Sequence, residues 1–162
     1  CGLRDRLGAT RWLVSLYNDK PWRYIVGNRD RSQEVWNKIY DVLVEGNQPW
    51  AKNAPVLALG LVQHNFEHNG QPNKAAIHDL GAASAGLTIE AVSRGLAVHQ
   101  MIGIEPEKAR KTFNLPESLE PFTGLAIGYA GEASSIPDDY AQRDMSKRER
   151  KPLQDIILAG SL

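Results

Sequence analysis

The chain has 162 residues, a length typical of one domain that buries roughly 70% of the surface its unfolded form exposes. Its 19 acidic and 19 basic side chains cancel, so no overall field favours nucleic acid or an anionic membrane as a partner. No apolar run approaches the roughly 20 residues that cross a bilayer, and the single cysteine excludes an internal disulfide framework. We therefore expect one soluble domain over residues 1–162, with a cytoplasmic location.

The first half of the chain predicts a polar turn, a strand, a helix and a second strand. The polar turn at 15–21 leads into an apolar strand that begins at Trp22. Apolar residues then recur at helical spacing between Asp30 and Gly46. The run 54–62 is continuously apolar, which is typical of a strand buried on both faces. We therefore expect this strand to be central in a sheet.

The second half continues the alternation of helices and strands. In chain order we expect a loop over 63–73, a helix of small residues over 74–96, a strand over 97–102, a helix over 106–113, a strand over 122–129, a polar excursion over 130–145, a basic cluster over 147–151 and a short apolar strand over 156–158. This alternation indicates a layered α/β or α+β sheet with helices on both faces.

The turn carries the most informative motif. Residues 11–22 read Arg-Trp-Leu-Val-Ser-Leu-Tyr-Asn-Asp-Lys-Pro-Trp. This segment resembles the flavin-contacting turn of the nitroreductase family of FMN-dependent oxidoreductases. Further matches follow in the family's order at 44–51, 78–96, 97–103 and 148–153. Three turn positions depart from the family pattern, with Val14 in place of Pro, Leu16 in place of a second Ser and Lys20 in place of Gln.

The resemblance implies a fold, an activity and an assembly. The implied fold is α+β, a three-layer α/β/α arrangement with a mixed sheet flanked by helices, in a domain-exchanging homodimer. The implied activity is hydride transfer from NAD(P)H through FMN to a small-molecule acceptor such as a nitroaromatic or a quinone. Because the turn comes so early in the sequence, we expect the chain to lack the family's amino-terminal helix and its Arg-x-Ser flavin motif.

The same resemblance implies a set of flavin-binding residues. Ser15 and Asn18 would touch the isoalloxazine ring of an FMN held mainly by the other subunit, and Asn47 would contact its pyrimidine side. Met101 and Gly103 would lie where the backbone approaches flavin N5. An Asn side chain suits a flavin edge because it offers both donors and an acceptor.

The basic cluster near the carboxyl end supplies the phosphate contacts that the resemblance implies. Arg148 and Arg150 match the two basic residues that bind the FMN phosphate, and planar guanidinium groups suit a phosphate monoester. We name no catalytic side chain, because the protein's part in hydride transfer is to orient the rings. Acceptor choice is assigned to lid residues at 63–72 and 134–145.

Each of these residues also has a purely local interpretation. Ser15 and Asn18 suit a turn, Asn47 a helix end and Gly103 a strand end, while the basic cluster suits a solvated surface. Asp79 suits either a helix start or a buried acid.

Two further alternatives concern metal binding and the function as a whole. His64 and His68 have metal-ligand spacing only within a helix, and their loop-like surroundings predict no metal site. The alternative function is a truncated, catalytically degenerate nitroreductase-fold protein with weak or no flavin binding.

Overall fold

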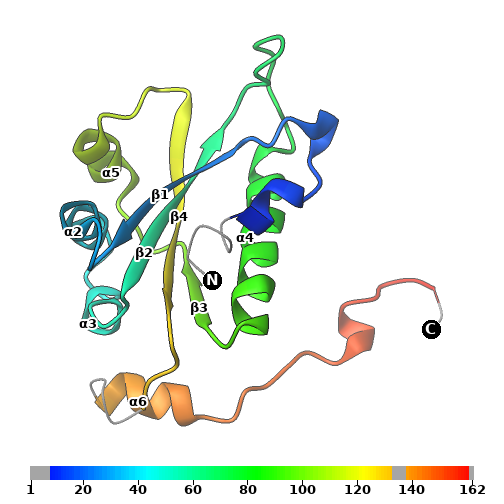
Figure 1. The fold of residues 1–162 in the computed structure, drawn as a ribbon. Helices are drawn as coiled ribbons and strands as arrows, with labels where there is room; N and C mark the ends of the chain where they lie inside the picture. Colours follow the sequence, from blue (N-terminus) through cyan, green and yellow to red (C-terminus); the bar gives the residue numbers. More distant parts are fainter. Residues whose placement is uncertain (1–7, 133–137, 161–162) are drawn as a thin grey trace. The chain divides into compact units, whose positions relative to one another are not determined.

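The computed structural model describes residues 8–132 and 138–160, and the chain divides into two compact units, Cys1–Ala130 and Gly131–Leu162. The first unit contains the sheet and its flanking helices (Figure 1). The second contains helix α6 (Asp138–Met145) and the 3-10 turn η4 (Leu153–Asp155). The single domain over residues 1–162 stays a prediction, and positions 134–137 of the expected lid lie outside the described residues.

The first unit is built around a four-stranded sheet. Its strands are β1 (Trp22–Asn28), β2 (Val56–Gln63), β3 (Ala97–Met101) and β4 (Leu119–Gly128). Their order in the sheet is β1-β2-β4-β3, so β2 and β4 are central, as the continuously apolar run at 54–62 predicts. All three strand pairings among the described residues are antiparallel. The expected mixture of parallel and antiparallel pairs is therefore not present in this part of the chain: β2 and β3 run in the same direction, but β4 lies between them and pairs antiparallel with both.

Helices cover both faces of this sheet, which confirms the α+β class and the three layers. One face is covered by α2 (Gln33–Asp41), α3 (Gln48–Ala51) and α5 (Pro106–Phe113), and the other by α4 (Ala76–Ser93) (Figure 1). Two short 3-10 segments, η1 (Ala9–Trp12) and η2 (Leu16–Asn18), precede β1, and η1 contacts α4. Among the helices that the structure describes, none has the length and apolar character of a membrane-spanning segment.

Strand β2 contributes side chains to two hydrophobic cores, one on each face of the sheet, because successive side chains of a strand point to opposite faces. Leu57, Leu59 and Leu61 pack with α2, α3 and α5. Ala58 and Val62 pack toward α4. The strand is buried on both faces, as expected from its unbroken apolar sequence.

The predicted elements of the first unit are confirmed, with small shifts at their ends. The short strand predicted at 156–158 is wrong, because these residues form no strand and follow the η4 turn. An isolated apolar run needs a neighbouring strand to satisfy its backbone groups, and no pairing with one exists among the described residues.

Tyr24 links β1 to α4 and makes the stability of the fold depend on pH in the alkaline range. Its hydroxyl lies 2.9 Å from the Ser84 hydroxyl, between the sheet and the helix. Burial raises the pKa of Tyr24 above its ordinary value of 10.0, and the hydrogen bond with Ser84 partly offsets the rise. The folded state therefore holds this proton more tightly than the unfolded state does.

We expect the stability that Tyr24 contributes to be complete below pH 10 and to be lost as the pH rises through the folded-state pKa. Urea unfolding of the parent and of Tyr24→Phe at several pH values between about 8 and 11 measures this effect. The parent should lose stability more steeply above pH 10 than the variant. Parallel curves for the two proteins would contradict the assignment.

Candidate functional site

The turn between η1 and β1 has an unusual backbone. Tyr17, Asn18 and Lys20 have φ angles of 53°, 58° and 50°, in the left-handed region that glycine normally occupies. Each such residue costs about 1 to 2 kcal/mol, with Asn at the lower end. Strain of this kind persists only where surrounding contacts enforce it, and it is concentrated at functional sites. The segment 15–20 is therefore the first candidate site.

Side chains within the turn hold it in place. The Ser15 hydroxyl oxygen accepts a hydrogen bond of 2.9 Å from the Lys20 backbone N–H. The Lys20 ammonium group donates to the side-chain oxygen of Asn18 and, at 3.4 Å, to its backbone carbonyl. Asn18 therefore has its acceptor occupied, while its NH₂ group donates to no other described residue. The Ser15 hydroxyl likewise keeps its own proton to donate.

A buried acid on α4 attaches the turn to the main fold. The Asp79 side chain is 5% exposed, and its Oδ2 accepts a 3.0 Å hydrogen bond from the Leu16 backbone N–H. Its Oδ1 lies 3.0 Å from His78 Nδ1. Both sequence interpretations of Asp79 hold, since it lies in the first turn of α4 and is also a buried acid.

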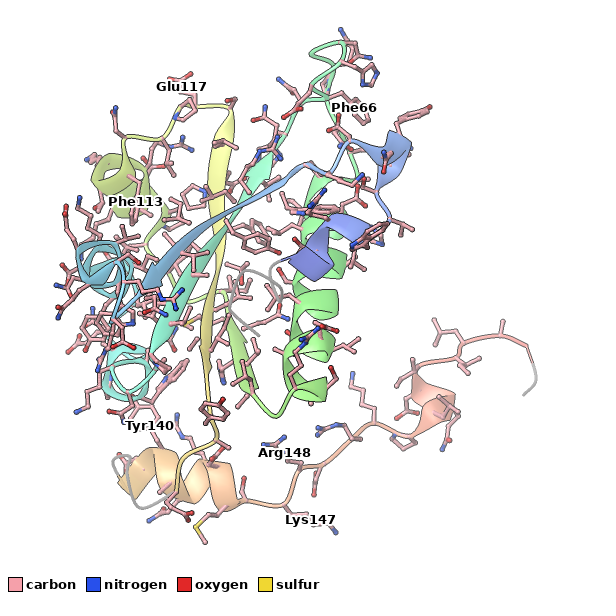
Figure 2. The ribbon with its side chains drawn as sticks, viewed as in Figure 1. Phe66, Phe113, Glu117, Tyr140, Lys147 and Arg148 are labelled. Carbon is pink, nitrogen blue, oxygen red and sulfur yellow. The ribbon has the colours of Figure 1, made fainter. Side chains whose placement is uncertain are left out.

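An open cavity of about 550 Å³ lies beside the turn, lined by Tyr17, Asn18, Asp19, Glu67 and His68. Its far wall comes from the loop between β2 and α4. Phe66 belongs to this loop (Figure 2). Its ring packs edge-on against that of Tyr17, with centroids 5.7 Å apart. The cavity therefore lies between the turn and part of the lid segment at 63–72 that is expected to determine acceptor choice.

A second candidate site pairs Asn47 with Gly103. The Asn47 side-chain NH₂ donates a 2.9 Å hydrogen bond to the Gly103 carbonyl, which also accepts from the Val44 N–H at 3.1 Å. A Cβ at position 103 would collide with Asn47 Nδ2 and would lie 2.9 Å from Val44 Cγ2. Only glycine therefore fits here without displacing Asn47. The N–H of Gly103 donates to no other described residue.

The Met101 side chain is part of the hydrophobic core and does not lie at the surface. Its side chain is buried in the core shared by β2, α2 and α5. Its carbonyl accepts a 3.0 Å hydrogen bond from the Thr123 hydroxyl. The rings of Trp50 in α3 and His99 in β3 lie 4.4 Å apart.

The remaining predicted residues, Arg148 and Arg150, follow helix α6. Arg148 lies on the extended segment after α6 (Figure 2), and Arg150, on the same segment, donates a 2.8 Å hydrogen bond to the Glu149 carbonyl. Both belong to the second unit. Within the first unit, the structure brings Asn47 and Gly103 into contact, and it places Ser15 and Asn18 in the separate turn.

The histidine pair does not form one site. His64 pairs with Glu120, while His68 Nδ1 lies 4.0 Å from Asp19 Oδ1. In residues 8–132 and 138–160, no group of three or more His, Cys, Asp or Glu side chains could hold a metal ion.

Two curated proteins are similar in sequence. An uncharacterized 15.4 kDa protein of Mycolicibacterium smegmatis is 35% identical over 144 residues, which cover 85% of this chain and 95% of that protein. A putative NADH dehydrogenase/NAD(P)H nitroreductase of Methanothermobacter thermautotrophicus is 28% identical over 129 residues. That match covers 76% of this chain and 63% of that protein, so the chain spans less than two thirds of it. None of the protein-family models searched matches this sequence.

Solved structures are similar over almost the whole chain. A crystal structure of an oxidoreductase containing FMN matches with a TM-score of 0.89 and 32% identity, covering 98% of this chain and 80% of that one. A nitroreductase family protein from Clostridium difficile 630 matches in fold with a TM-score of 0.72 and 23% identity, covering 99% and 86%. The chain belongs to the nitroreductase family.

The donors of both sites suit a flavin such as the FMN of the similar oxidoreductase. A flavin edge presents carbonyl oxygens and ring nitrogens. The NH₂ group of Asn18, the hydroxyl of Ser15 and the N–H of Gly103 are donors that no other described residue occupies. The Asn47 NH₂ group already donates one hydrogen bond to the Gly103 carbonyl. The Met101 side chain is buried, so only its backbone could contact a flavin. The residues of this nitroreductase-family chain therefore fit a flavin through backbone and small polar side chains.

The sequence does not reveal the roles of two residues. The sequence marks Lys20 only as a departure from the family pattern, whereas the structure shows it orienting Asn18. Asp19 has no distinguishing pattern in the sequence, although its side chain is only 4% exposed. No periodic signal could have revealed Asp19, because contacts with a loop almost fifty positions away bury it.

Proposed function

We propose that this chain is an FMN-dependent oxidoreductase that uses NAD(P)H to reduce nitroaromatic, quinone or similar acceptors. The strained turn at 15–20 carries the proposal. Its sequence matches the family's flavin-contacting turn, and its left-handed backbone presents the unoccupied donors of Ser15 and Asn18. A turn with only a connecting role would need no such strain.

Gly103 supports the same proposal. The family resemblance assigns this position to the backbone that approaches flavin N5, and its N–H is unoccupied by other described residues. The collision that a Cβ would make with Asn47 explains why the position is glycine. FMN bound here would supply the hydride-transfer chemistry, and Asn47 and the Gly103 N–H would bind and orient its ring.

Arg148 and Arg150 are proposed to hold the FMN phosphate. Both side chains are exposed guanidinium groups. Because the chain has no net charge, a phosphate dianion would be attracted by these two groups and not by the protein as a whole. Charge-assisted hydrogen bonds of this kind contribute about 1.5 to 3 kcal/mol each.

A homodimer in the cytoplasm is proposed as the working form. Several large apolar side chains of η1, of the turn after it and of α4 are exposed, among them Trp12, Val14, Ile89 and Val92. Exposed apolar surface on neighbouring elements is typical of an interface, and η1 contacts α4. In the family, the flavin contacts of the turn reach a site on the other subunit.

Titration of the 162-residue chain with FMN, followed by quenching of flavin fluorescence, tests the proposal. We expect saturable binding by the parent, and binding weakened by tenfold or more in Arg148→Ala/Arg150→Ala. Lys147→Ala/Lys151→Ala removes the same charge from the same segment and should bind nearly as the parent does.

Each other outcome has a defined meaning. Absence of binding by the parent would contradict the proposal and favour a nitroreductase-fold protein that has lost its flavin. Equal losses in the two double variants would show that general charge, and no specific phosphate contact, drives binding. Oxidation of NADH and of NADPH in the presence of a nitroaromatic or a quinone then measures turnover by the flavin-loaded protein.

A further inference from the structure

The cavity beside the turn has chemistry that flavin binding does not use. It is lined by Tyr17, Asn18, Asp19, Glu67 and His68, so two carboxylates and two ring systems border it, and neither Lys nor Arg does. We propose that this cavity binds a small organic cation, an ammonium group carried on an aromatic or apolar body. The proposal does not depend on FMN and shares only Asn18 with the proposed flavin contacts.

The carboxylate of Asp19 carries this proposal. Its side chain is 4% exposed. Its Oδ1 accepts a 3.2 Å hydrogen bond from the Glu67 backbone N–H. Its Oδ2 is buried and has no hydrogen-bond partner among the described residues. A buried carboxylate oxygen without a partner is unfavourable unless something else supplies a donor.

The cationic side chains near Asp19 are committed to other groups. Arg23 pairs with the Glu67 carboxylate and donates to the Lys20 and Trp22 carbonyls, both at 2.8 Å. The Lys20 ammonium group is held by Asn18. His68 Nδ1, at 4.0 Å, is beyond hydrogen-bonding distance from Asp19 Oδ1. Within the described part of the chain, Asp19 therefore has no ammonium or guanidinium partner.

Aromatic rings complete a cation site. Tyr17 is 79% exposed, and its ring stands edge-on to Phe66 and to His68. Aromatic faces attract ammonium groups, and an apolar body gains further from contact with them. Because Oδ2 is closed to solvent, we expect the carboxylate to turn about its Cβ–Cγ bond when the ligand binds, and so to exchange its hydrogen bond from the Glu67 N–H for one from the cation. A cation gives this arrangement both its missing donor and its counter-charge.

Two matched probes test the proposal on the 162-residue chain without added flavin. Benzylammonium chloride and benzyl alcohol have nearly the same shape and differ in charge. Backbone amide shifts in ¹H–¹⁵N NMR spectra report binding of each, and we expect the amides of Tyr17, Glu67 and His68 to move. Benzylammonium should bind at least about tenfold more tightly than benzyl alcohol.

Three variants test whether benzylammonium binds in the cavity. Asp19→Asn keeps an acceptor for the Glu67 N–H but removes the charge, and it should weaken benzylammonium binding about tenfold. Asp41→Asn makes the same change at an exposed position at the end of α2 and should leave binding unchanged. Tyr17→Leu should weaken benzylammonium binding roughly threefold.

Several outcomes would overturn the proposal. They are equal affinity for the two probes, parent-like binding by Asp19→Asn, shifts confined to other residues, or no shifts at ligand concentrations on the order of 10 mM. If Asp19→Asn fails to fold, the two probes on the parent and the Tyr17→Leu variant still decide. Because no flavin is present, failure here leaves the proposed oxidoreductase function untouched, and the FMN titration leaves this proposal untouched.

Discussion

Replacement of Asp79 by alanine is expected to lower the free energy of unfolding by about 3 kcal/mol. The carboxylate is buried on α4, and its Oδ2 accepts the hydrogen bond of the Leu16 N–H, 63 positions earlier in the chain. Alanine removes the acceptor and leaves that N–H without its partner. It also releases the strained turn from the helix that holds it.

Asp79→Asn is the control that separates hydrogen bonding from charge. Its side-chain oxygen can still accept from the Leu16 N–H, so we expect it to retain more than half of the stability that alanine loses. Asp41→Ala removes an exposed acid at the end of α2 and should change stability by less than about 0.5 kcal/mol. Urea unfolding monitored by circular dichroism measures all three. Equal losses for Asn and Ala would show that the hydrogen bond to Leu16 is unimportant.

The same variant links the fold to the proposed site. If the left-handed conformation of Tyr17, Asn18 and Lys20 depends on the bond from Leu16 to Asp79, alanine at 79 should let these residues relax. FMN affinity should then fall in Asp79→Ala even under conditions where the protein remains folded. Unchanged affinity would show that local bonds, such as that from Lys20 to Ser15, suffice to hold the turn.

The features that the sequence predicts correctly are those with a local cause. Helix α5 begins at Pro106, which favours the first helical position, and it ends before Asn114, whose φ of 50° suits a left-handed cap. Residues 56–62 of β2 are buried on both faces because none of them is polar. Patterns of this kind extend over a few residues and can therefore be recognised without knowledge of the rest of the fold.

The features that escape prediction depend on residues far apart in the chain. The bond from Asn47 to Gly103 spans 56 positions, and the burial of Asp19 depends on the backbone of Glu67. Composition and periodicity carry no information about such contacts. The family resemblance found Asn47 and Gly103 separately, as two flavin contacts, whereas the structure shows that they also bind each other. The wrong strand at 156–158 has the same origin, since a strand depends on a partner that its own residues do not specify.

Replacement of Gly27 by alanine is expected to destabilise the fold by about 3 kcal/mol or more. Gly27 lies in β1, where α2 crosses the strand. A Cβ at this position would collide with the backbone N and Cα of Trp36 and would lie 2.9 Å from the carbonyl carbon of Val35. All three are backbone atoms, so no side-chain rotation can relieve the overlap. Helix α2 would have to move away from the sheet.

This movement would be costly because α2 fills one of the cores. Trp36 and Ile39 are buried there, and the Trp36 indole N–H donates a 3.0 Å hydrogen bond to the Ala54 carbonyl. For a protein of this size, 3 kcal/mol corresponds to a fall in melting temperature of roughly 6 to 12 °C. Gly46→Ala is the matched control, because nothing lies within 4 Å of the Cβ it would add. A melting temperature for Gly27→Ala close to that of Gly46→Ala would mean that α2 can shift along β1 without loss of packing, and that the close approach at Gly27 does not fix the position of the helix.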